Sequence, residues 1–157
     1  MSQITTLSLF RYGNWRRKVW ALSQMGLATG RLKGTPGMRF LKLLGTGAEG
    51  FSTKPDWAVY GVLQVWDTAA SADAFFKNHP QFQRYLRKAE ESLTLYMRAV
   101  KSKGNWNGVN PFEPTAAPES GNDALAVITR ATIHKKYLHT FWKNVPASQR
   151  PLMGIRG

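Results

Sequence analysis

The chain has 157 residues, 43% of them hydrophobic and 12% aromatic, which is typical of one globular domain with a core of its own. It has no cysteine, and this excludes disulfides, thiol catalysis and cysteine-ligated zinc or iron–sulfur clusters. Its 22 Lys and Arg outnumber its 9 Asp and Glu, and the net charge of +13 predicts an anionic partner, either a membrane surface or nucleic acid.

No apolar run is long enough to span a membrane, and the first residues lack the basic start and apolar centre of a signal peptide, so we expect a cytoplasmic protein. Aromatic residues are interleaved with the basic ones, as at membrane interfaces and in proteins that bind single-stranded nucleic acid. Nucleic acid is the less favoured partner because the strands lack RNP-type motifs. The remaining interpretation is a solvated basic surface that binds neither a membrane nor a nucleic acid.

The first strand is predicted over residues 5–11, where Leu7 and Leu9 alternate with Thr6 and Ser8. Asn14 is a suitable N-cap for a helix from residue 15 to about residue 28. Helical spacing predicts that one set of apolar side chains on this helix faces the core, with the basic residues 16–18 facing out. That set is Trp15, Val19, Leu22 and either Met25 or Gly26.

Two apolar strands follow, over residues 38–44 and 58–66, and the second is so continuously apolar that we expect it at the centre of a sheet. The loop of residues 45–57 between them has three glycines and two aromatic residues, Phe51 and Trp57. A packed loop of this length predicts a wall or lid for an apolar ligand.

The rest of the predicted sheet comes from a second helix and a fourth strand. The helix is capped by Ser71 or Asp67 and is interrupted at His79, just before a proline. The strand covers residues 92–100, with Leu93 and Leu95 on one face.

The predicted order, β-α-β-β-α-β, is the ferredoxin-like α+β arrangement with helices on one face of the sheet. We expect a ferredoxin-like domain over residues 1–104 and an irregular linker over 105–123, anchored by Trp106 and Phe112. Residues 124–157 are expected to begin a second repeat, with a strand over 124–133 and a basic helix over 135–144. Because a four-stranded sheet with helices on one face leaves its other face uncovered, we expect either a homodimer of the α+β-barrel type or a chain that has been shortened.

Three histidines are present, and none lies in a metal-binding motif. His79 either satisfies backbone groups at the helix interruption or is an axial haem ligand. Arg11 and Arg130 end two similar strands, and Lys54 lies in the glycine-containing loop. These three cations either reach solvent or a helix C-terminus, or they bind haem propionates or position a substrate. Because no hydrolase or nucleotide-binding motif is present, an enzyme of this sequence is expected to depend on a cofactor for its reactivity.

Several sequence blocks, taken together and in order, resemble the spheroidene monooxygenase family of acyclic carotenoid 2-ketolases. The blocks are TLSLFRY, NWRRKVWALSQMG, FLKLLGTGAEGFSTKPDWAVYGVLQVW, ESLTLYMRAVKSKGNWNGVNPFEP and ALAVITRATI. The resemblance covers nearly the whole chain. Members of that family have a complete second repeat, of which this chain has only the first strand and helix.

The resemblance implies oxidation of an apolar carotenoid at its 2-position with a haem b cofactor, O2 and an external electron donor such as ferredoxin. It also implies peripheral association with the inner or photosynthetic membrane. His79 is then the candidate iron ligand, with Arg11, Lys54 and Arg130 as further haem-binding candidates. The expected apolar walls of the substrate site are Leu7, Leu9, Phe40, Phe51, Trp57 and Tyr60. The alternative function is a non-catalytic α+β-barrel module that binds an apolar ligand or a partner subunit.

Overall fold

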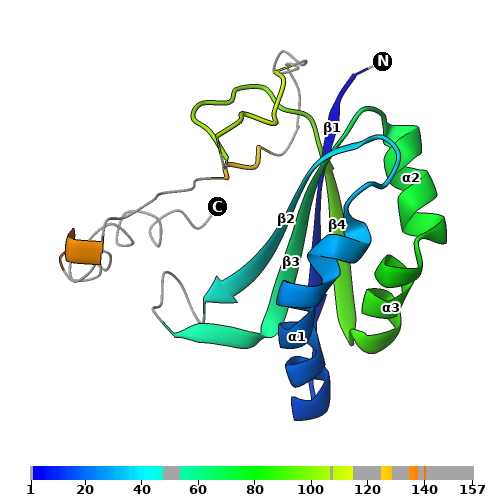
Figure 1. The fold of residues 1–157 in the computed structure, drawn as a ribbon, viewed down its shortest axis with the longest axis vertical. Helices are drawn as coiled ribbons and strands as arrows, with labels where there is room; N and C mark the ends of the chain where they lie inside the picture. Colours follow the sequence, from blue (N-terminus) through cyan, green and yellow to red (C-terminus); the bar gives the residue numbers. More distant parts are fainter. Residues whose placement is uncertain are drawn as a thin grey trace.

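The structure is a computed structural model that describes residues 2–47, 54–106, 108–114, 125–128, 135–137 and 140. Its elements are β1 (Ile4–Arg11), α1 (Trp15–Leu32), β2 (Met38–Gly47), β3 (Pro55–Trp66), α2 (Ala69–Asn78), α3 (Pro80–Lys88) and β4 (Glu91–Met97). The strands form one antiparallel sheet in the order β2-β3-β1-β4, and the helices cover one of its faces (Figure 1). The predicted ferredoxin-like fold is confirmed, with the second helix divided into α2 and α3.

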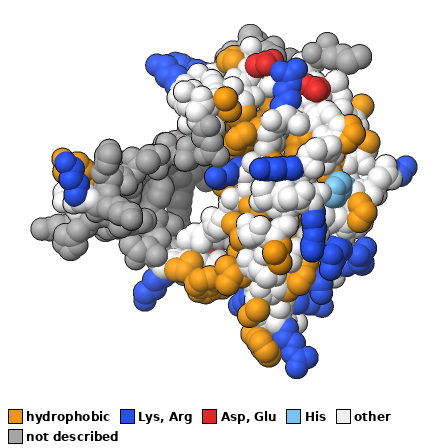
Figure 2. All heavy atoms as spheres, in the orientation of Figure 1, with side chains coloured by type: hydrophobic (Ala, Val, Ile, Leu, Met, Phe, Trp, Pro, Cys, Tyr) orange, Lys and Arg blue, Asp and Glu red, His pale blue; other side chains and the backbone are white. Residues whose placement is uncertain are grey.

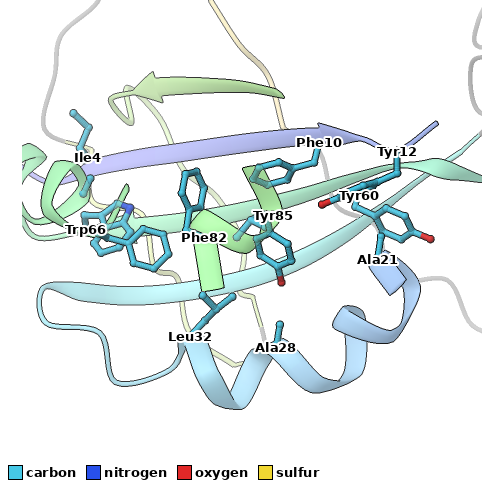
Figure 3. Packing of buried hydrophobic residues seen from close by; sticks show 13 residues of the cluster. Ile4, Phe10, Tyr12, Ala21, Ala28, Leu32, Tyr60, Trp66, Phe82 and Tyr85 are labelled. Atoms are coloured by element: carbon cyan, nitrogen blue, oxygen red, sulfur yellow. The ribbon is translucent and has the colours of Figure 1, made fainter. Parts of the chain in front are cut away.

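The two faces of the sheet have different surroundings. Phe10 and Tyr60 are register partners on the face toward the helices, where Phe10 packs against Phe82 and Tyr85 (Figure 3). Side chains alternate along a strand, so the neighbouring residue Leu9 faces the other way. We call the face that α1, α2 and α3 leave uncovered the open face. The predicted central position of β3 is confirmed, because it pairs with both β1 and β2.

The helix ends are set by side-chain caps, one of which differs from the prediction. Asn14 caps α1 as predicted, accepting a hydrogen bond from the Arg17 N–H at 2.9 Å. The cap of α2 is Thr68, whose hydroxyl accepts from the Ser71 N–H at 3.1 Å. The prediction of Ser71 or Asp67 as this cap is wrong, because Asp67 pairs with Arg39 instead.

The predicted orientation of α1 is wrong for Trp15, Val19 and Leu22, whereas Met25 packs against the core as predicted. Trp15, Val19 and Leu22 are 69%, 58% and 45% exposed, so they face away from the sheet. The buried residues of α1 are Ala21, Gln24, Ala28 and Leu32, and Trp20 and Met25 pack against the same core while partly exposed. Two stripes with helical spacing therefore lie on opposite sides of this helix. The stripe with the smaller side chains faces the sheet, where alanine lets the helix approach closely.

The segment between β2 and β3 is shorter than predicted. Thr46 still pairs with Asp56, and Gly47 with Pro55, so both strands run beyond the expected boundaries. The pairing shifts register between Gly45 and Thr46, because Gly45 pairs with Tyr60 whereas Thr46 pairs with Asp56. Residues 48–53, including Phe51, lie outside the described residues. β4 ends at Met97, before the predicted boundary at residue 100.

Residues 98–106 and 108–114 form an irregular segment beside the end of the sheet where β4 finishes. Trp106 and Phe112 contact Phe40, with ring centroids 5.9 and 6.3 Å away, which confirms the predicted anchors. Gln3 holds the same segment by donating to the Pro111 carbonyl and accepting from the Glu113 N–H. The aromatic contacts and these two hydrogen bonds fix the segment at one end of the sheet (Figure 1).

The predicted second repeat falls largely outside the described residues. Residues 125–128, inside the predicted strand of 124–133, are exposed and form no strand. Lys135–Tyr137 form a single 3₁₀ turn where the basic helix was predicted. The rest of both predicted elements is not described.

Two glycines between α1 and β2 have positive φ angles but different surroundings. Gly37 (φ +77°) lies where an added Cβ would be 2.5 Å from Ser71 Oγ, whereas Gly34 (φ +80°) has open space. We expect Gly34→Ala to lower the free energy of unfolding by about 1 kcal/mol, because L residues are disfavoured at this φ. Gly37→Ala is expected to cost about 1 to 3 kcal/mol more, because a clash is added to the same strain. Urea unfolding of both variants measures the difference, and equal losses would contradict the packing at Ser71.

Candidate functional site

The open face is apolar along its centre. Leu7 pairs with Leu63 on one side and Leu95 on the other, and the next residue on this face, Leu9, pairs with Leu93. Leu63 is fully buried, whereas Leu93 and Leu95 are 53% and 38% exposed. This surface indicates contact with an apolar ligand or partner, because exposed apolar side chains usually gather where something binds.

The two ends of the open face are closed by different groups. At one end Trp106 and Phe112 pack on Phe40, as described above. At the other end Arg11 lies 3.8 Å from Glu91, its partner on β4, and both side chains are mostly exposed. The leucines therefore lie between an aromatic cluster and a solvated ion pair.

A glycine on β3 lets two leucines of the open face approach each other. A Cβ added at Gly61 would be 3.3 Å from Leu9 Cδ2 and 3.4 Å from Leu44 Cβ. Leu9 and Leu44 belong to the strands on either side of β3. The missing side chain thus makes the apolar surface continuous across three strands.

The predicted substrate walls do not all line one surface. Leu7, Leu9 and Phe40 lie on the open face, and Trp57 is 52% exposed near the start of β3. Tyr60 is buried on the helix side with its ring 6.1 Å from that of Tyr12, so its assignment to the same wall is wrong. Phe51 lies outside the described residues.

Sequence reasoning missed the open-face residues of β4 as part of this wall. Leu93 and Leu95 were predicted to share a face of the fourth strand, but the pairing of β4 with β1 was not known. The register now places these two residues beside Leu9 and Leu7. The alternation of leucine with polar residues over 92–95 was the signal for this face.

The predicted haem-binding cations are not brought together. Arg11 is at the exposed end of β1, paired with Glu91. Lys54 is exposed just before β3 begins, and Arg130 lies outside the described residues. The structure therefore shows no cluster of these cations among the described residues.

His79 joins α2 to α3. The backbone N–H of His79 donates to the Phe75 carbonyl at 2.8 Å, and this bond ends α2. The ring Nδ1 of His79 accepts from the backbone N–H of Gln81 at 3.2 Å, and this bond caps the start of α3. The imidazole packs on the Phe75 ring, with centroids 4.6 Å apart. Burial lowers the pKa of His79, so the ring is neutral at neutral pH, as an acceptor Nδ1 requires. This confirms the prediction that His79 satisfies backbone groups at the interruption of the helix.

A haem does not fit the set of residues predicted to bind it. A haem ligated by His79 would lie on the helix side of the sheet, because His79 packs on Phe75 in that layer. Arg11 and the leucines lie on the open face, so the sheet separates the candidate ligand from the candidate propionate partner and the apolar wall. Among the described residues, no group of three or more His, Asp or Glu side chains is arranged to hold a metal ion.

The hollow that the described residues enclose on the helix side of the sheet is too small for a large ligand. A hollow of about 10 Å³ lies between α1 and the sheet, lined by Phe10, Tyr12, Tyr60 and Tyr85 among others. That volume admits about one water molecule. Burial, followed by the nearby Tyr85 and Tyr60, raises the pKa of Tyr12, so this phenol stays protonated at neutral pH. The hollow thus excludes a haem or a carotenoid.

The pKa of His79 predicts a specific pH dependence of stability. The pKa of His79 in the folded protein is below the usual 6.5 of the unfolded chain. In the pH range around these two pKa values, the unfolded chain therefore binds more protons than the folded one. The stability from His79 is therefore present above the unfolded pKa and lost as the pH falls toward the folded pKa. We expect His79→Asn, which keeps an acceptor for the Gln81 N–H, to change stability at pH about 8 by less than about 1 kcal/mol and to reduce the loss on acidification.

Urea unfolding of both proteins at pH about 8 and about 5.5 checks this expectation. An equal loss of stability in parent and variant would show that another group is responsible.

The fold and the open face define the general class to which this protein belongs. The chain is a ferredoxin-like α+β protein whose helices leave one apolar sheet face uncovered. A crystal structure of a protein of unknown function from Nitrosomonas europaea has the same fold, with a TM-score of 0.51 at 9% identity over 68% of this chain and 97% of that one. No protein-family model matches the chain. None of the helices within the described ranges is long and apolar enough to cross a bilayer.

The sequence relatives are more specific. The chain is 37% identical to the spheroidene monooxygenase of Rhodobacter capsulatus over 145 residues, which is 91% of this chain and 60% of that protein. It is 34% identical to the spheroidene monooxygenase of Cereibacter sphaeroides over 92% of this chain and 45% of that one. The predicted resemblance is confirmed, and the chain is a relative of the spheroidene monooxygenases. It spans about half the length of the curated relatives that it matches.

Proposed function

We propose that this chain is a carotenoid monooxygenase that oxidises the 2-position of acyclic carotenoids, as in the conversion of spheroidene to spheroidenone. The observation that carries the proposal is the match of about nine tenths of the chain to proteins named spheroidene monooxygenase. The open face supports it, because a polyene without polar groups needs an apolar surface of this kind.

The described residues account for binding and positioning. In the proposed complex the polyene lies along Leu7, Leu9, Leu93 and Leu95, where its contact with the sheet excludes water. Each oxygen insertion converts a C–H bond at the 2-position to C–OH and reduces the other atom of O2 to water, with two electrons and two protons from an external donor. Two insertions at the same carbon would give a geminal diol, which loses water to leave the carbonyl. A ferredoxin is the class of donor that we propose.

A haem, which the resemblance implies, would supply O2 activation when bound. His79 is not proposed as its ligand, because His79 caps α3 on the other side of the sheet. The two other histidines in the sequence, His134 and His139, lie outside the described residues.

Turnover by the purified chain tests the proposal. The full chain is mixed with detergent-solubilised spheroidene, O2, ferredoxin and its reductase, with and without added haem. The expected product has one carbonyl oxygen more and two hydrogens fewer, detected by chromatography and mass. Spheroidene that is bound but not oxidised under all of these conditions would contradict the proposal.

A second function is favoured by the exposed apolar side chains of the open face. In this alternative the open face binds an apolar ligand, or a second copy of the chain, without chemistry. The exposed Leu93 and Leu95 fit either occupant. Sedimentation of the chain with and without carotenoid separates a homodimer closed through the open face from a monomer that only binds pigment.

A further inference from the structure

The side of α1 that faces away from the core is apolar. Trp15, Val19 and Leu22 are exposed there, together with Gly26, where an added Cβ would meet nothing within 4 Å. The spacing i, i+4, i+7, i+11 puts these four residues in one line, which we call the α1 stripe. The outward side of a helix in water is usually polar. The α1 stripe therefore indicates contact with an apolar phase or partner.

The surroundings of the α1 stripe are strongly basic. Neither α1 nor α3, which contact each other, contains an Asp or Glu. Their basic residues are Arg16, Arg17, Lys18, Arg31, Arg84, Arg87 and Lys88. Figure 2 shows hydrophobic and basic side chains side by side where Figure 1 places α1 and α3, with acidic ones only at the top of that view. Of the seven, Arg17 lies 4.0 Å from an acidic partner, Glu90.

We propose that α1 is a membrane-contacting helix that binds an anionic bilayer surface. Trp15, Val19 and Leu22 enter the interface between headgroups and acyl chains, and the Lys and Arg residues of α1 and α3 bind lipid phosphates. Amphipathic helices with basic flanks and tryptophan bind membranes in this way. Each basic residue near an anionic surface adds to the attraction.

The charge of this surface selects between its possible occupants. A second copy docked through the same stripe would bring two identical basic surfaces together, and like charges in an interface are repulsive. A nucleic acid would satisfy the basic residues through its phosphates but would leave the apolar side chains of the stripe without an apolar partner. An anionic bilayer satisfies both.

The stripe is on the helix side of the molecule, across the sheet from the open face. The proposal therefore does not depend on carotenoid oxidation, and the two fail independently. A change in the α1 stripe is expected to leave the oxidation of detergent-solubilised spheroidene as it is in the parent.

Vesicle co-sedimentation of the full chain tests the proposal with two matched variants. Val19 in the stripe and Val109 outside it are 58% and 60% exposed, so Val19→Asp and Val109→Asp change the charge equally and neither disturbs the core. We expect the parent to bind vesicles of phosphatidylcholine with phosphatidylglycerol and to bind phosphatidylcholine alone much more weakly. Val19→Asp is expected to weaken binding to the anionic vesicles about tenfold, and Val109→Asp less than about twofold.

Three results would overturn the proposal, given that far-ultraviolet circular dichroism shows both variants folded. One is equal binding by Val19→Asp and Val109→Asp. Another is tight binding of a single-stranded RNA that Val19→Asp does not weaken, together with no vesicle binding, which would make the surface a nucleic-acid site. The third is a dimer that Val19→Asp dissociates in the absence of vesicle binding.

Discussion

Replacing Trp66 by alanine is expected to lower the free energy of unfolding by about 3 to 5 kcal/mol. Trp66 ends β3 with no exposed surface, and its ring packs against Phe75 and Phe76 at centroid distances of 5.0 and 6.2 Å. Its Nε1–H donates to the Thr6 hydroxyl at 2.9 Å inside the core. Alanine would leave a cavity between β3 and α2 and a buried hydroxyl without its donor.

The comparison uses a second buried variant and an exposed tryptophan. Trp66→Phe removes the hydrogen bond but keeps a ring, so its loss is expected to be about half that of alanine. Trp57, 52% exposed, is the matched control, and Trp57→Ala is expected to cost less than about 1 kcal/mol. Thermal and urea unfolding measure all three. Should Trp66→Ala be too unstable to purify, a Trp66→Phe loss no larger than that of Trp57→Ala would contradict the core position of Trp66.

Placing a carboxylate on the open face is expected to weaken carotenoid binding about a hundredfold, because the charge must lose water beneath an apolar ligand. The variant is Leu95→Glu, on β4 beside Leu7. The control is Leu86→Glu on α3, because Leu86 and Leu95 are 36% and 38% exposed on opposite sides of the sheet. Leu86→Glu is expected to bind carotenoid within about twofold of the parent.

Titration of each variant with spheroidene in detergent, followed by the absorption shift of the pigment, gives the affinities. Unfolding by urea confirms that the two substitutions have similar effects on stability. Equal affinities for Leu95→Glu and Leu86→Glu would place the carotenoid somewhere other than the open face.

The sheet could be predicted because its strands carry simple patterns. β1 alternates around Leu7 and Leu9, and β3 is almost continuously apolar, as expected for a strand with neighbours on both sides. The break between α2 and α3 followed from Pro80, which has no N–H to donate. These features are local, so a single sequence contains enough information to find them.

The orientation of α1 could not be predicted, because periodicity alone does not show which side of a helix faces the sheet. Trp15, Val19 and Leu22 are the more hydrophobic set, but the helix packs through Ala21 and Ala28. Small side chains let α1 approach the sheet closely. How closely it can approach depends on the aromatic side chains of the core that lie opposite the helix. Trp15, Val19 and Leu22 then face outward, where they can contact a partner outside the chain.

The candidate site was only partly predictable, because register decides which strand residues share a face. Tyr60 and Trp57 are close in sequence, yet Tyr60 is buried against the helices and Trp57 is exposed. A register shift between Met38 and Phe40 is not marked by a glycine or proline at either residue. The pairing of β4 with β1, which completes the apolar surface, joins segments more than 80 residues apart, as the bond between Ser8 and Thr94 shows at a separation of 86.

Hydrogen exchange of the full chain in detergent, with and without spheroidene, tests most directly whether the open face binds the pigment. The account predicts slower exchange in β4, where Leu93 and Leu95 contact the polyene, and unchanged exchange in α3. Slower exchange in α3 with β4 unchanged would contradict it, because the ligand would then lie on the helix side of the sheet.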